Sequence, residues 1–136
     1  MTWQRAALVA AGLATPSVPA FAHHSFAMFD QRRIMTLEGT VTEFQWTNPH
    51  AFIEMDVPVA GGATQHWSIE LNSPNNLKRQ GWSRTSVRSG DRITLRMNPL
   101  RDGHHGGLFL DVRLPNGRVL DSGLPKNGTP VNVPNV

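Results

Sequence analysis

Hydrophobic and polar residues alternate with a period of two in several segments of the chain. In residues 50–57 the odd positions are apolar, whereas Glu54 and Asp56 fall on the opposite face. Similar alternation occurs in residues 66–71, 92–97 and 108–114. Side chains of a β-strand point to opposite faces in turn, so each segment predicts a strand with one buried and one exposed face. In the last segment the even positions form the buried face, which places Phe109 on the exposed one.

An earlier segment, residues 37–46, is expected to form a bent strand. Its alternation changes phase between Val41 and Phe44, and Gly39 lies close by. Such a change of phase is typical of a β-bulge, in which one extra residue bends the strand. A short further strand is expected at residues 118–120.

The intervening segments predict tight turns and one short helix. Ser73 is suited to the N-cap of a helix, Pro74 to its first turn and Gly81 to its C-terminal end. Hairpin turns rich in Pro, Gly and Asn are expected at residues 47–49, 60–62 and 115–117.

This order of elements predicts an all-β domain with one short helix. Three strands, a helix and two or three further strands, with a bent first strand, are typical of a small Greek-key barrel of the OB type with five to six antiparallel strands. A β-sandwich requires more strands than the pattern provides. We expect the barrel to span residues 23–120. Residues 121–136 carry three prolines and few large apolar side chains, and they predict a loose C-terminal tail.

The first 22 residues are typical of a signal peptide. Arg5 supplies a positive charge, residues 6–14 are uniformly small and apolar, and Ala20-Phe21-Ala22 places small residues at the −3 and −1 positions of a cleavage site. The apolar run is too short to span a bilayer. We therefore expect export to a bacterial periplasm or secretion, a mature chain that begins at His23, and no membrane insertion after cleavage.

Composition excludes several classes of function. The chain has 136 residues and no Cys, so disulfide scaffolds, thiolate zinc sites and cysteine nucleophiles are ruled out. The formal net charge of +3 is modest. The sequence contains no Gly-x-Ser-x-Gly nucleophile motif, no phosphate-binding loop and no dinucleotide fingerprint, so an enzyme is less favoured than a binding protein.

A set of short motifs is spread along the mature chain. They are Ala-His-His-Ser-Phe-Ala-Met-Phe-Asp at 22–30, Leu-Glu-Gly-Thr-Val at 37–41, Trp-Thr-Asn-Pro-His at 46–50, Gly-Trp at 81–82, Gly-Asp at 90–91 and Pro-Leu-Arg-Asp-Gly at 99–103. Together they resemble the motifs of the DUF6152 family, small exported bacterial proteins of unassigned activity. The resemblance implies a single exported domain. It implies no reaction and no role for His104 or His105.

Histidines are the candidate metal ligands. Cleavage at the predicted site would make His23 the first residue, and its α-amine and ring Nδ1 can chelate one metal ion. Candidate further ligands are His24, His50, His104 and His105. A third nitrogen would suit Cu(II), which prefers tetragonal nitrogen ligands. An N-terminal His is similar, in that one feature, to the histidine brace of copper-dependent polysaccharide oxygenases and certain periplasmic copper carriers. In an OB barrel the loops at residues 50 and 104–105 border the usual ligand site.

The same histidines also have simpler explanations, which the sequence leaves open. Histidines 23 and 24 can be tolerated at a cleavage site, His50 can cap the preceding turn, and histidines 104 and 105 can be solvated. His66 is expected to be a hydrogen-bonded surface residue beside Glu54 and Asp56. Trp46, Trp67 and Trp82 are expected in the core.

Three classes of function follow from these observations. The favoured hypothesis is an exported binding module that holds a transition metal or small ligand, or docks on a periplasmic partner protein. The alternatives are a copper-dependent oxidoreductase and a ligand-free accessory protein. Nucleic acid is not expected as a partner, because Glu54, Asp56 and Glu70 would repel phosphates from the predicted sheet face.

Overall fold

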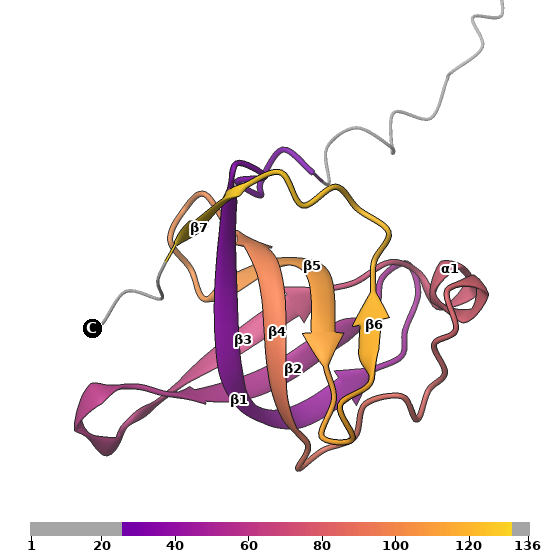
Figure 1. The fold of residues 1–136 in the computed structure, drawn as a ribbon, viewed down its shortest axis with the longest axis horizontal. Helices are drawn as coiled ribbons and strands as arrows, with labels where there is room; N and C mark the ends of the chain where they lie inside the picture. The colour runs from indigo at the N-terminus through magenta and orange to yellow at the C-terminus, as the bar shows by residue number, and fades with distance from the viewer. Residues whose placement is uncertain (1–25, 132–136) are drawn as a thin grey trace, which may run out of the picture.

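A ring of five strands forms the body of the computed structural model, which describes residues 26–131 (Figure 1). The ring contains β1 (Arg33–Gln45), β2 (Phe52–Pro58), β3 (Thr64–Glu70), β4 (Arg92–Pro99) and β5 (Gly106–Arg113). The shorter strands are β6 (Val119–Asp121) and β7 (Thr129–Val131), a turn of 3-10 helix spans Ala60–Gly62, and helix α1 spans Pro74–Arg79. The predicted signal peptide at 1–22, His23, His24 and residues 132–136 lie outside the described residues.

The ring closes in the order β1, β2, β3, β5, β4 and back to β1. Strands β1–β2, β2–β3, β4–β5 and β1–β4 pair antiparallel. This order, with α1 between β3 and β4, is that of an OB-type barrel, so the predicted all-β fold with one short helix is confirmed. Antiparallel pairing was expected throughout, but β3–β5 and β1–β7 are parallel. The two strands of each parallel pair are not consecutive in sequence. The chain between them crosses back before the second strand begins, so that both strands run in the same direction.

A β-bulge bends β1, as the change of phase predicted. The β1–β2 register shifts between Val41 and Glu43, which leaves Thr42 as the extra residue. Before the bulge Leu37 and Val41 face the core, and after it Phe44 packs against the core. A Cβ atom at Gly39 would collide with the carbonyl oxygen of Asp56, so glycine permits β1 to approach β2 this closely.

The barrel interior is filled by the residues that the alternation assigned to it, except in β5, where Leu108 and Leu110 are buried but lie outside the core cluster. Trp46, Trp67 and Trp82 are buried as predicted. Phe109 was expected to be exposed, but only 1% of its surface is accessible. The β4–β5 register shifts opposite Arg96-Met97, so that Leu110 is an extra residue and the alternation changes phase there. Phe109 and Val112 therefore both belong to the core.

The residues at the two ends of α1 have the roles that the sequence predicted for them. The hydroxyl oxygen of Ser73 accepts a hydrogen bond from the backbone N–H of Asn76 at 3.4 Å, and Pro74 stands in the first turn. Gly81 has a φ of 87°, a conformation that favours glycine and ends the helix. Within residues 26–131, no helix has the length and apolar character that crossing a membrane requires.

The prediction of a loose tail is wrong for residues 121–131. Strand β7 pairs with the start of β1, where Arg33 lies beside Thr129 and Met35 beside Val131. Lys126 also forms an ion pair with Asp111 at 3.5 Å. Backbone pairing, polar contacts and the packing of Val131 against the core hold this segment. It has no run of alternating apolar residues, which is why the hydrophobic pattern did not reveal it.

Candidate functional site

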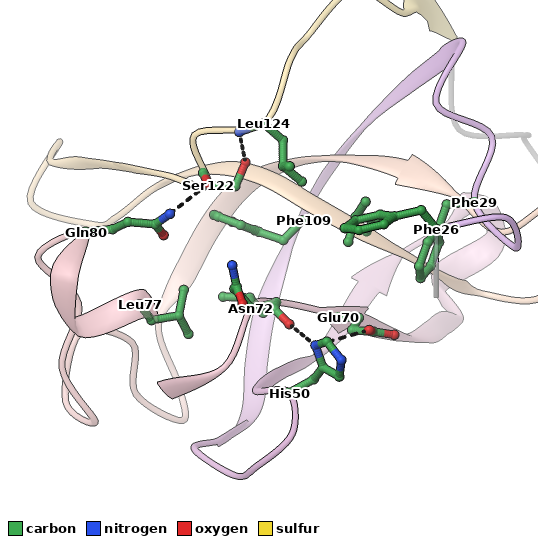
Figure 2. A pocket seen from close by; sticks show the side chains of 12 residues that line it. Phe26, Phe29, His50, Glu70, Asn72, Leu77, Gln80, Phe109, Ser122 and Leu124 are labelled. Atoms are coloured by element: carbon green, nitrogen blue, oxygen red, sulfur yellow. Dashed lines mark hydrogen bonds and ion pairs between the residues drawn. The ribbon is translucent and has the colours of Figure 1, made fainter. Parts of the chain in front are cut away.

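A small cavity lies where the first described residues, the end of β3 and helix α1 meet (Figure 2). Its volume is about 70 Å³, enough for a few water molecules or one small ligand. Buried apolar side chains form most of its walls, among them Phe29, Leu77 and Phe109. The polar residues that line it are His50, Glu70, Asn72, Gln80 and Ser122.

The imidazole of His50 is held in a defined orientation at this cavity. Its Nδ1 lies 3.1 Å from the carbonyl oxygen of Leu71 and 3.4 Å from a carboxylate oxygen of Glu70. Because a carbonyl oxygen can only accept, Nδ1 carries the proton and donates it. In the tautomer with this proton, the lone pair of the ring lies on Nε2. Metal-binding histidines have this arrangement, with one nitrogen held by a carbonyl or carboxylate and the other free to bind.

The loop that carries His50 is fixed against the end of β3. The Thr47 hydroxyl donates to the carbonyl oxygen of His50 at 3.0 Å. The backbone N–H of Leu71 donates to the carbonyl oxygen of Ala51 at 2.8 Å, and that of Ala51 to Asn72 at 3.1 Å. These bonds place His50 beside Glu70 although the two residues are far apart in sequence.

Glu70 is the acidic member of this site. Burial raises the pKa of its carboxyl group from the ordinary value of 4.5, and the nearby charge of His50 opposes the rise. Glu70 therefore stands as a partly buried acidic group on the Nδ1 side of His50.

The loop before β5 places its histidines elsewhere. His104 Nδ1 lies 3.0 Å from Asp102, and hydrogen bonds from the backbone and side chain of His104 lower the pKa of that carboxyl group. His105 stacks on Trp67 with ring centroids 4.7 Å apart. Both histidines line a separate hollow. His104 and His105 therefore lie apart from the cavity beside His50. Among the residues that the structure describes, no three His, Cys, Asp or Glu side chains are arranged to hold a metal.

His66 is a hydrogen-bonded surface residue, as predicted. Its Nδ1 lies 3.0 Å from Asp56 and its Nε2 lies 2.9 Å from Glu54. These two bonds, first that to Asp56 and then that to Glu54, raise the pKa of His66 above 6.5. Because both ring nitrogens are occupied by carboxylates, His66 offers no free ligand atom in this arrangement.

Sequence reasoning missed several residues of the cavity. Phe26, Phe29 and Leu124 line it together with Glu70. They come from segments far apart in the chain, and no local pattern shows that these segments meet. One signal was available, since both phenylalanines lie in the motif at residues 22–30 that resembles a family landmark.

Comparisons with known proteins identify a family and assign no activity. No curated protein matches the chain. Among solved structures, it is similar to a mitochondrial single-stranded DNA binding protein from S. cerevisiae, with 16% identity, a TM-score of 0.47, and coverage of 64% of this chain and 94% of that chain. The family of unknown function DUF6152 matches residues 10–110. The chain therefore belongs to the DUF6152 family.

Proposed function

We propose that this member of the DUF6152 family is an exported periplasmic binding protein that holds a transition-metal ion, preferably copper, at the cavity beside His50. Signal peptidase removes residues 1–22. The new N-terminus, His23, then supplies its α-amine and ring Nδ1, and His50 supplies Nε2. One observation carries the proposal: Phe26, which follows His23 by three residues, lines the same cavity as His50.

Chain length and ligand chemistry both support this set. Three residues of extended chain span about 10 Å, so the first mature residue is tethered within reach of the cavity. Three nitrogen donors suit Cu(II). Glu70 and the Leu71 carbonyl hold the Nδ1 side of His50, which orients its other nitrogen. His24 stays as an alternative donor to His23, whereas His104 and His105 line a different hollow and have no part in the proposal.

The proposal is for binding without catalysis and without nucleic acid. The outward residues Glu54 and Asp56 oppose the approach of a phosphate backbone. An oxidoreductase with the same copper ligands would differ by turnover. Oxygen consumption by the copper-loaded protein in the presence of ascorbate, above that of free copper, would replace the proposal with that alternative.

The test uses tag-free protein purified from the periplasm. Mass spectrometry is expected to give a chain that begins at His23, and calorimetric titration with Cu(II) is expected to give one tight site. His50→Ala and His23→Ala should each weaken binding at least tenfold, because each removes a nitrogen donor. The matched control His104→Ala should bind as tightly as the unchanged protein. Equal affinity in all four proteins would overturn the proposal.

A further inference from the structure

The hollow beside His104 and His105 is lined by residues of β1, β3 and the loop between β4 and β5. Its volume is about 240 Å³, compared with about 70 Å³ for the cavity in Figure 2. Met35 and Trp67 contribute to its walls, and each is only 3% exposed. Leu100 adds further apolar surface. This hollow, which we call the Trp67 hollow, has room for one small organic molecule with an apolar body.

The indole of Trp67, which forms part of the wall, carries an unused hydrogen-bond donor. Its Nε1 is buried, and within residues 26–131 it has no hydrogen-bond partner. Native proteins leave few buried polar groups unpaired, because each one gives up its bonds to water on folding. The Nε1 of Trp82 is unpaired as well, but that ring packs against Phe44 and Phe109. Trp67 instead borders the hollow, where an oxygen atom of a bound molecule would give its donor a partner.

Arg33 gives the hollow a positive charge. The buried side-chain amide of Asn98 donates to the carbonyl oxygen of Arg33 at 2.7 Å, which fixes the backbone of Arg33 at the start of β1. The nearby carboxylate of Asp30 lies 3.6 Å from Arg32 and 4.0 Å from Arg101. Within the described part of the chain, no carboxylate pairs with Arg33 and none lines the hollow. The guanidinium of Arg33 is therefore available to an anion.

We propose that the Trp67 hollow binds a small aromatic carboxylate. The planar guanidinium of Arg33 binds a carboxylate through two hydrogen bonds, and the carboxylate has further acceptor sites for the indole N–H of Trp67. The ring of the ligand lies against the apolar walls, where His105 stacks on Trp67 with ring centroids 4.7 Å apart. Arg88 and Arg118 border a different hollow, but its walls are largely polar and do not suit an apolar ring. This binding does not depend on the proposed copper site.

The first test uses para-fluorobenzoate as the probe and tag-free protein from which metal has been removed by dialysis. Fluorine NMR is expected to show saturable binding. The neutral amide para-fluorobenzamide should bind about tenfold more weakly, because it cannot form a charged pair with Arg33. Acetate and inorganic phosphate, at the concentration of the probe, should not displace it, because neither has a ring to fill the apolar part of the hollow.

The second test observes the donor itself by proton–nitrogen NMR. The indole N–H signal of Trp67, identified by its loss in Trp67→Phe, should move downfield as para-fluorobenzoate binds, because the N–H gains an acceptor. The indole signal of Trp82 is the matched control and should stay in place, since that ring packs against two phenylalanines away from the hollow.

The third test compares two neighbouring arginines. Arg33→Gln should weaken binding of the probe about tenfold, because it removes the charged partner of the carboxylate. Arg32→Gln makes the same change in net charge at a residue that does not line the hollow, and it should bind within about twofold of the unchanged protein. Circular dichroism melts check that both variants are folded.

Five results would overturn this assignment. Equal losses in the two arginine variants would show that net charge alone governs binding. Equal affinity for the amide would show that no anion is recognised, and displacement by phosphate would show that the ring has no part. An unmoved Trp67 signal would place the probe elsewhere, and a lack of saturable binding would leave the hollow without this ligand.

Discussion

The loops before β2 and β5 each place a histidine beside a carboxylate, and the two pairs have different surroundings. The side chains of His50 and Glu70 are 37% and 18% exposed, whereas those of His104 and Asp102 are 81% and 61% exposed. Burial raises the pKa of Glu70, whereas hydrogen bonds from His104 lower the pKa of Asp102. The same two residue types thus form an enclosed pair at one loop and a solvated pair at the other.

The difference arises from segments that neither loop contains. Phe29, Leu77 and Phe109 come from three other parts of the chain and line the same cavity as the His50 pair, which reduces the exposure of Glu70. The hollow beside His104 is larger, about 240 Å³, and the neighbouring His105 stacks on Trp67. A histidine near a carboxylate therefore becomes a candidate site only where distant segments enclose it.

The largest expected difference between the two regions is in their packing. Phe109→Ala should lower the free energy of unfolding by about 3–5 kcal/mol, because it removes a buried aromatic ring from the wall beside His50. Leu100→Ala, at the hollow beside His104, should cost about 1 kcal/mol because that side chain is partly exposed. Urea unfolding measures both. Equal losses would mean that the two hollows are packed alike.

The next effect concerns the carboxylates as supports for their histidines. Glu70→Gln should weaken Cu(II) binding about tenfold, since the partner that orients a metal-binding imidazole typically contributes this much. Asp102→Asn makes the same chemical change beside His104 and should leave affinity within about twofold. Calorimetric titration separates them. A comparable loss in Asp102→Asn would place the second loop at the copper site.

The two carboxyl groups should titrate on opposite sides of their ordinary pKa values, Glu70 above 4.5 and Asp102 below 3.8. The folded state disfavours ionisation of Glu70, so ionisation lowers the free energy of unfolding. This loss of stability is absent below pH 4.5 and is complete above the raised pKa of Glu70. For Asp102 a stabilisation is present above pH 3.8 and is lost as the pH falls through its lowered pKa. Carbon-13 NMR titration of both carboxyl groups checks the signs. Shifts in the same direction would contradict the comparison.

The smallest effect is expected at the exposed histidine. His104→Ala should change the free energy of unfolding by less than about 0.5 kcal/mol, because solvated side chains that make one surface ion pair contribute little. Thermal unfolding at neutral pH measures it. A loss above about 1 kcal/mol would indicate that this loop is more constrained than its exposure suggests.

The sequence predicted the parts of the fold that follow local rules. Alternation located β2, β3 and β4, because each has one buried and one exposed face, and it placed His66 correctly beside its two carboxylates. It failed at Phe109, because the bulge at Leu110 changes the phase inside a strand that is buried on both faces. It also missed β7, a three-residue strand at the edge of the sheet that is defined by its pairing.

The candidate site was predicted only in part. His50 was selected for its residue type and its place in a loop, but nothing near it in sequence indicated Glu70 or the Leu71 carbonyl. These contacts depend on the β2–β3 register, which brings the end of β3 back to the start of β2. The sequence also did not show that His104 and His105 line a different hollow from His50, because it gives no distance between two loops.

The extra residue in β1 makes this barrel more sensitive to changes in length than to changes in chemistry. Thr42 is exposed, and another polar residue can replace it at little cost. Its deletion would leave Val41, Glu43 and Phe44 in regular alternation opposite Met55, Glu54 and Ile53, and would remove the bend with which β1 pairs first with β4 and then with β2. Related chains should therefore vary freely in identity at this position while conserving the number of residues between Gly39 and His50.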